Sequence, residues 1–171
     1  GEAAESALTK TLPQDEPKFL ADATVVRLAK WLRILGYDTV CSGDSEQDLL
    51  LRAGAEGRTV LSRKRKWPAC AAWHPELVIL RRERAGDQIQ ELLERSVILP
   101  DERRFLTRCI RCNIPLEEVR KDCVAESVPI HIRESIEAFH GCPGCGRVYW
   151  PGSHPERIRQ FLRRRSPDCL P

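Results

Sequence analysis

Residues 18–36, KFLADATVVRLAKWLRILG, decide the fold class of this chain. They begin with a short apolar run that ends on Asp22, and they continue as an amphipathic helix pattern closed by Gly36. The apolar side chains of that pattern fall on one helical stripe: Val25, Leu28, Leu32 and Leu35. A strand, an acid and an amphipathic helix in this order predict the start of an α/β sheet.

The same alternation continues along the chain. Further strands are predicted at residues 37–42, 58–62 and 77–80, and further helices at residues 45–55 and 87–97. Short apolar runs separated by helical patterns favour a mostly parallel sheet flanked by helices. In such a sheet, ligands bind beyond the carboxyl ends of the strands. Side chains that follow the predicted strands are therefore candidates for a functional site.

Three acids are expected at that edge of the sheet. Asp22 follows the first strand, Asp44 follows the second, and Asp48 lies on the next helix. Converging carboxylates repel one another unless a cation joins them. Magnesium or manganese would supply that cation, since both take carboxylate oxygens and can orient water for attack on a phosphodiester. The sequence allows an alternative equally well, in which Asp22 and Asp44 cap the helices that follow them.

Positive charge is concentrated around the third and fourth predicted strands. Residues 1–57 hold six Lys or Arg and ten Asp or Glu, whereas residues 58–84 hold eight and two. A basic track beside an acidic site suits a polyanion such as single-stranded RNA, although each charge run could equally be a solvated face. The cations predicted to contact RNA are Arg63, Lys64, Arg65, Lys66, Arg81 and Arg82. Trp67 and Trp73 are candidates to stack on an unpaired base, with packing as the commoner role.

Two CxxC pairs, Cys109 with Cys112 and Cys142 with Cys145, lie in the C-terminal half of the chain. Four thiolates so placed complete a tetrahedral zinc site with no open position, which is typical of a structural ion. Disulfides or four unrelated buried thiols are the alternatives. The other cysteines lack regular spacing, which favours a reducing, intracellular compartment. The sequence shows neither a signal peptide nor an apolar run long enough to span a bilayer.

These patterns divide the chain into four stretches. They are a flexible lead-in at residues 1–17, an α/β domain at 18–102, a zinc ribbon at 103–153 and a basic C-terminal helix and tail at 154–171. The last helix has an apolar side formed by Ile158, Phe161 and Leu162, which we expect to dock on the ribbon or on a partner protein. Because the chain contains no Met, we expect it to be a piece of a longer protein.

Five blocks of the sequence together resemble the C-terminal domain of the Mut-seven exonuclease family. They are KFLADATVVRLAKWLRILGYDT (18–39), GDSEQDLLLRA (43–53), TVLSRKRKW (59–67), RFLTRCIRCNIPLEEV (104–119) and CPGCGRVYWPGSHPERI (142–158). The resemblance covers residues 18–159 and implies a PIN-like nuclease fold with an appended zinc ribbon. That family occurs alone in prokaryotes and, in animals, behind a three-prime to five-prime exonuclease domain. The resemblance also matches Asp22, Asp44 and Asp48 to acidic positions of the PIN-like site.

One departure from the family pattern concerns Lys64. Where the family typically carries an Asp in a Thr-Arg-Asp-Arg-like block after the third strand, residues 62–65 of this chain read Ser-Arg-Lys-Arg. A cation in place of a carboxylate repels a divalent ion, which leads to the hypothesis that this PIN-like site is impaired. Lys64 would then occupy the space of the ion and contact phosphate as a point charge.

Three functions remain open from the sequence. The first is an RNA-binding, substrate-positioning module of a larger exoribonuclease with a degenerate PIN-like centre, which the charge asymmetry and Lys64 favour. The second is an active ribonuclease that depends on magnesium or manganese, which the three acids favour. The third is a protein-interaction domain that recruits a partner through the ribbon or through the apolar side of the last helix.

Overall fold

The computed structural model describes residues 16–73, 76–152 and 154–166. Its main sheet has four parallel strands, as the alternating sequence pattern predicts, and their order is β2-β1-β3-β4. The strands are β1 (Lys18–Ala21), β2 (Thr39–Cys41), β3 (Arg58–Ser62) and β4 (Leu77–Ile79). Most of the predicted lead-in, residues 1–15, lies outside the described residues.

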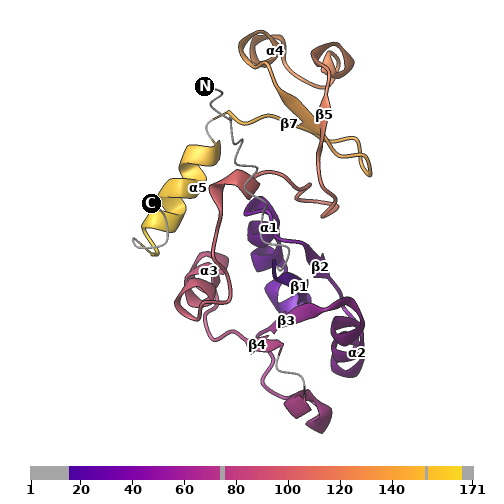
Figure 1. Ribbon diagram of the computed structural model, residues 1–171, viewed down its shortest axis with the longest axis vertical. Helices are drawn as coiled ribbons and strands as arrows, with labels where there is room; N and C mark the ends of the chain where they lie inside the picture. Colours follow the sequence, from indigo (N-terminus) through magenta and orange to yellow (C-terminus); the bar gives the residue numbers. More distant parts are fainter. Residues whose placement is uncertain (1–15, 74–75, 153, 167–171) are drawn as a thin grey trace, which may run out of the picture.

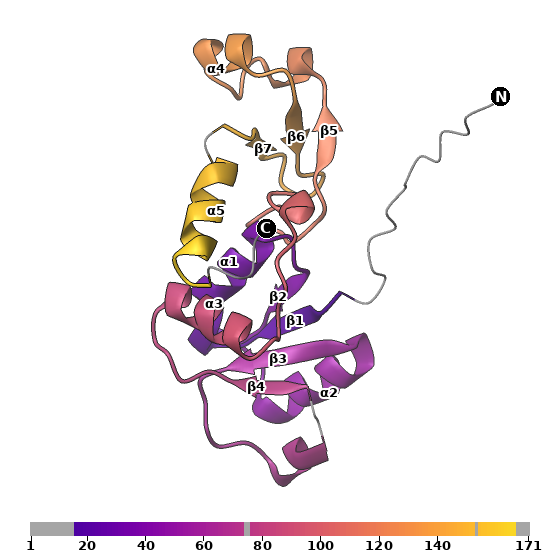
Figure 2. The same cartoon turned by 60° about the vertical axis from the view of Figure 1, so that its left-hand side comes forward.

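Helices cover both faces of this sheet, with α1, α3 and α5 on one side and α2 on the other (Figure 2). Their bounds are α1 (Val26–Ile34), α2 (Glu46–Glu56), α3 (Ala85–Glu94) and α5 (His154–Arg163). Successive strand residues point to opposite faces, so Phe19 and Ala21 pack toward α1 and α3 while Leu20 packs toward α2. The predicted flanking helices are confirmed, although the predicted helix at 87–97 begins two residues earlier, at Ala85.

A second, smaller module follows the main sheet and lies at one end of the long axis of the molecule (Figure 1). Its antiparallel sheet consists of β5 (Glu117–Val119), β6 (Phe139–Gly141) and β7 (Val148–Tyr149), in that order. The connection from β5 to β6 carries a 3-10 turn, η4 (Lys121–Val124), and α4 (Ile130–Ser135). Its core is small, with Val124, Val128 and Phe139 buried and the Trp150 ring packed edge-on against Phe139 at 6.4 Å between centroids.

The last helix packs on the α/β core of its own chain. Ile158 and Leu162 are buried among the residues of α1 and α3, and Phe161 stacks on Trp31 with their ring centroids 4.0 Å apart. The Arg165 guanidinium lies over the Phe161 ring, 3.8 Å from its centroid. The apolar side of α5, expected from the sequence to dock on the ribbon or on a partner, is therefore occupied by the α/β core.

Hydrogen bonds join the first CxxC turn to the end of α1. The amide of Leu106 donates to the carbonyl of Ile34 at 2.9 Å, and the Arg33 guanidinium donates to the carbonyl of Ile110 at 2.8 Å. Gly36 allows this close approach, because a Cβ on it would lie 2.3 Å from the Arg104 carbonyl oxygen and its φ is +94°. The smaller module, called the ribbon below, is thus fixed against the edge of the α/β domain.

The described residues also form three other 3-10 turns: η1 (Ala23–Val25), which precedes α1, η2 (Ala69–Trp73) and η3 (Glu102–Arg104). Within the described ranges, no helix has both the length and the apolar character needed to cross a membrane.

Candidate functional site

The order of the strands reverses between β1 and β3, whose carboxyl ends lie side by side. From β1 the chain passes through α1 to β2 on one side, and then through α2 to β3 on the other side of β1. A reversal of this kind opens a crevice at the carboxyl ends of the two strands, which is where α/β sheets bind ligands. Asp22 directly follows β1, and Lys64 lies two residues after β3.

Asp22 is almost fully buried at this crevice, with 2% of its surface exposed. One carboxylate oxygen accepts hydrogen bonds from the Thr24 amide at 2.9 Å and from the Thr24 hydroxyl. The other oxygen accepts a hydrogen bond from the Ser62 hydroxyl across the sheet. Asp22 therefore caps the turn that precedes α1, which is the alternative that the sequence left open, and it also ties β1 to β3.

Asp44 and Asp48 lie on the surface at the start of α2. The cap of α2 is Ser45, whose hydroxyl oxygen accepts from the Asp48 amide at 3.2 Å and donates to the Asp48 carboxylate at 2.9 Å. The carboxylate of Asp44 instead accepts from the Ser42 hydroxyl at 2.7 Å, so Asp44 does not cap this helix. Among the described residues, no three carboxylates have oxygens within 4.8 Å of one another.

Lys64 forms an ion pair with Glu46 at the crevice. Its ammonium nitrogen lies 2.7 Å from a Glu46 carboxylate oxygen, and its amide donates to the Ser62 hydroxyl oxygen at 2.9 Å. The hydrogen bond to Glu46, followed by the charges of Glu46 and Asp22, raises the pKa of Lys64 above its ordinary value despite partial desolvation. The same hydrogen bond lowers the pKa of Glu46. Glu46 was not among the predicted site acids, and its only signal in the sequence is an acid in the first turn of the predicted second helix.

Three of the six cations predicted to contact RNA are paired with acids of the same chain. Arg63 lies 3.6 Å from Glu83, Arg82 lies 2.9 Å from Glu94, and Lys64 is held as described above. The remaining three are exposed and have no ion-pair partner within the described part of the chain: Arg65, Lys66 and Arg81. The unpaired cations are the ones left available to an external polyanion.

The two tryptophans considered as base-stacking residues differ in their surroundings. Trp67 packs against the core beneath α2, and its indole nitrogen donates to the Lys64 carbonyl at 2.8 Å. It is a packing residue that also holds the loop after β3. Trp73 instead lies in η2 with 86% of its surface exposed, so the commoner role expected for tryptophan does not apply to it.

A groove of about 960 Å³ lies between α1 and the start of α3. It begins at Thr24, the hydroxyl partner of Asp22, and its lining includes the exposed cations Arg27, Lys30 and Arg84. The one acid in its lining, Glu83, lies 3.6 Å from Arg63, which leaves the groove with an excess of positive charge. This groove was not predicted, although Arg27 and Lys30, three residues apart on the polar face of the helix after Asp22, are a visible signal in the sequence.

The four cysteines of the CxxC pairs come together as predicted. Their sulfurs all lie within 4.8 Å of one another, and those of Cys109 and Cys145 are 3.8 Å apart. Four sulfurs placed tetrahedrally at about 2.3 Å from a zinc ion are separated by about 3.8 Å, whereas a disulfide needs about 2.05 Å. All the cysteines of the described residues are free thiols. The donor set therefore fits a metal ion and does not fit a disulfide.

Hydrogen bonds to the Cys109 sulfur favour its thiolate form. Burial alone would raise its pKa, but hydrogen bonds from the Tyr149 hydroxyl and from the amides of Cys112 and Arg111 outweigh burial and lower it to about 6. The Tyr149 oxygen lies 3.2 Å from the sulfur. Each CxxC turn is followed by a residue with positive φ, Asn113 at 65° and Gly146 at 71°, so the two turns are built alike.

Asn113 also joins the metal-binding turn to the sheet. Its amide oxygen accepts from the Thr39 amide at 2.9 Å, and its amide nitrogen donates to the Asp38 carboxylate at 2.7 Å. Asn113→Ala is expected to lower the free energy of unfolding by roughly 2–4 kcal/mol, because it removes both hydrogen bonds and strains the positive φ. Chemical denaturation measures this loss. Asn113→Gly is the matched control, since it removes the same bonds without the strain, and equal losses in both variants would contradict a cost of backbone strain.

Comparison with known proteins adds one match. A family model described as the Mut7-C RNAse domain matches residues 17–162, which include the crevice, the basic groove and all four cysteines. No curated protein and no solved structure matches this chain.

Proposed function

Because this chain belongs to the Mut7-C RNAse domain family, we propose that it is an RNA-binding module that positions single-stranded RNA for a larger exoribonuclease. In this proposal the PIN-like centre of the module itself is degenerate. The observation that carries the proposal is the ion pair between Lys64 and Glu46, whose nitrogen and oxygen lie 2.7 Å apart at the crevice.

The ion pair supplies from within the chain the positive charge that a catalytic metal would bring. Lys64 neutralises Glu46, and the oxygens of Asp22 are already engaged by the hydroxyls of Thr24 and Ser62. A divalent ion would have to displace the ammonium and disrupt these hydrogen bonds before it could bind. The arrangement therefore favours loss of metal binding over a working two-carboxylate site.

The basic groove supplies the binding surface. Arg27, Lys30 and Arg84 are exposed along it, and phosphates of an extended single strand are the natural ligands of such a row of cations. The groove starts beside the crevice, so a strand lying in it would pass the degenerate centre. A module of this kind would deliver the strand to a fused or associated exonuclease domain.

One experiment tests the proposal directly. A labelled single-stranded RNA is incubated with the full chain, with added magnesium or manganese and without either, and binding and cleavage are scored together. The expected result is binding that weakens steeply with salt and yields no metal-dependent product. Cleavage that requires the added metal and disappears in Asp22→Asn would refute the degenerate centre, and absence of binding would refute the RNA-binding role.

The groove cations have their own expected effect. The double substitution Arg27→Ala and Lys30→Ala is expected to weaken RNA binding and to reduce the slope of log K against log salt by about 1.4, or about 0.7 for each lost phosphate contact. Fluorescence anisotropy over a salt series measures both quantities. Arg163→Ala with Arg164→Ala removes the same charge from the exposed end of α5 and is the control. An equal loss in the control would mean that net charge, and not the groove, governs binding.

An active ribonuclease is the second candidate, and two observations favour it. The family is described as an RNAse domain, and Asp22 is 2% exposed at the crevice with Glu46 nearby. The Asp22→Asn arm above separates this candidate from the first. The third function predicted from sequence, recruitment of a partner through α5, loses its supporting observation because Ile158 and Leu162 are buried in the core of the chain.

We infer that the metal held by the four cysteines is structural zinc. Four thiolates satisfy a tetrahedral zinc ion and leave no position for water or substrate. Cys109, Cys112, Cys142 and Cys145 would hold the ion, and its role would be to fix the two CxxC turns of the ribbon. The four-cysteine site is therefore given a structural role and no catalytic role in RNA cleavage.

A further inference from the structure

A second hollow, of about 710 Å³, lies where the ribbon meets α1 and α5. Most of its wall is apolar, and four aromatic side chains contribute to it: Trp31 of α1, Phe105 after η3, and the neighbours Tyr149 and Trp150 at the end of β7. Small-molecule sites in proteins have volumes of this size and the same mixture of aromatic walls with few polar groups. The ribbon core and the stacked pair of Trp31 with Phe161 use only part of these ring surfaces.

The polar edge of this aromatic pocket carries no carboxylate. Its basic lining residues are Arg157, His140 and His154, all of them exposed. Arg157 has no ion-pair partner within the described residues. An edge of this composition suits a ligand with an anionic part and disfavours a cationic one.

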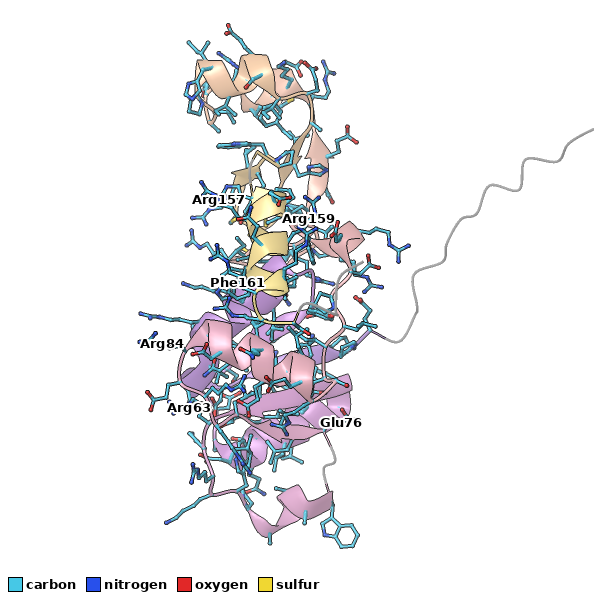
Figure 3. The ribbon with its side chains drawn as sticks, turned by 90° about the vertical axis from the view of Figure 1, so that its left-hand side faces the viewer. Arg63, Glu76, Arg84, Arg157, Arg159 and Phe161 are labelled. Atoms are coloured by element: carbon cyan, nitrogen blue, oxygen red, sulfur yellow. The ribbon has the colours of Figure 1, made fainter. Side chains whose placement is uncertain are left out.

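The aromatic pocket adjoins the basic groove. Both hollows include Trp31, Ile34 and Ile110 in their linings. Arg84, from the groove, and Arg157, from the edge of the pocket, project along the same edge of the molecule (Figure 3). An RNA strand that follows the groove away from Thr24 can therefore reach the pocket, and Glu83 is the one carboxylate in the linings of the two hollows.

We propose that the aromatic pocket binds an unpaired nucleobase of the RNA strand whose phosphates lie along the basic groove. A nucleobase is planar and has an apolar face, and in a strand each base is attached to a ribose that is joined to phosphates, which matches aromatic walls beside a cationic edge. This inference rests on the proposed RNA-binding function and adds to it a second element of recognition. An apolar peptide would also fit the walls, but the continuity with the groove and the cationic edge favour RNA.

The test compares two oligonucleotides of equal length and charge. One is a fluorescein-labelled single-stranded oligouridylate, and the other is its abasic counterpart, which keeps the phosphates and lacks every base. Trp150→Leu removes an aromatic wall and keeps an apolar side chain against Phe139, while Trp150→Phe restores a ring. Unfolding temperature and bound metal content verify that each variant is folded.

Trp150→Leu is expected to weaken binding of the normal oligonucleotide about tenfold, within the range found when one stacked base loses its aromatic partner. Binding of the abasic oligonucleotide should stay unchanged, and Trp150→Phe should recover most of the loss. Trp73→Leu tests the other exposed candidate for base stacking, which lies outside the pocket with 86% of its surface exposed. It should change neither affinity.

The opposite outcomes are distinct. Equal affinity of the wild-type protein for both oligonucleotides would overturn the nucleobase site while leaving RNA binding intact. Full RNA affinity in Trp150→Leu would also overturn the nucleobase site and would indicate that the pocket binds a segment of a partner protein. A loss of affinity confined to Trp73→Leu would place base stacking at η2. If neither oligonucleotide binds the wild-type protein, the proposed RNA-binding function itself fails.

Discussion

Lys64→Asp is expected to create a divalent metal site at the crevice and to tighten Mn²⁺ binding by roughly 100-fold or more, because a repelling charge is replaced by a ligand. In the natural chain the ammonium of Lys64 lies 2.7 Å from Glu46, and the charge of Asp22 acts on it as well. The substitution removes the internal cation and leaves carboxylates facing one another, which only a bound cation can relieve. Metal-dependent cleavage of single-stranded RNA is the expected consequence.

Electron paramagnetic resonance of free Mn²⁺ measures the binding, and a labelled RNA reports cleavage in the same samples. Lys66→Asp is the matched control, since it makes the same charge change on the same loop at an exposed residue with no ion-pair partner in the described chain. Lys64→Ala removes the charge that repels Mn²⁺ without adding a carboxylate, so it separates the loss of repulsion from the gain of a metal ligand. Equal Mn²⁺ affinity in Lys64→Asp and Lys66→Asp would contradict the view that Lys64 occupies the place of the metal.

Removal of the metal from the four cysteines is expected to unfold the ribbon and to leave the α/β domain folded. The ribbon has three short strands and only a few buried apolar side chains, which is too little to stabilise it without a cross-link. A structural zinc site contributes roughly 10–16 kcal/mol to folding in small zinc-binding peptides. The α/β domain has its own larger cores on both faces of the sheet and does not depend on the ion.

Cys142→Ser, or a strong chelator, produces this loss, and amide hydrogen exchange measures where it falls. The amides of Cys142 and Gly146, bonded within the second CxxC turn, should lose protection, whereas those of Val60 and Leu80 in the main sheet should keep it. Cys123→Ser alters an exposed thiol outside the group and serves as the control. Unfolding by a reducing agent in place of a chelator would show that disulfides, and not a metal, hold the ribbon.

The local pattern of residues was enough to predict the main sheet. Val25, Leu28, Leu32 and Leu35 are buried as the helical stripe required, and the strands run parallel as the alternation of strands and helices predicts. The cysteine group was also predictable, because the spacing within each CxxC pair already aims two sulfurs at one point. Features of this kind depend on neighbours within a few residues.

The sequence pattern did not show which acid of the second helix reaches Lys64. Asp22 lies at the crevice, but Asp44 and Asp48 are exposed at the start of α2, and Glu46 is the acid that meets Lys64. One position along a helix turns a side chain by about 100°, so residues 46 and 48 face different directions although both follow the second strand. Only the packing of α2 on the sheet decides which of them reaches the crevice.

The sequence by itself determined the parallel α/β sheet, its flanking helices and the four-cysteine group, because periodicity and short spacings act through local geometry. The tertiary structure decided the partners of the charges, the docking of α5 on α1 and the two adjoining hollows that share Trp31, Ile34 and Ile110. These features join residues far apart in the chain, and their free energy comes from burial and charge pairing that exist only after the elements have packed.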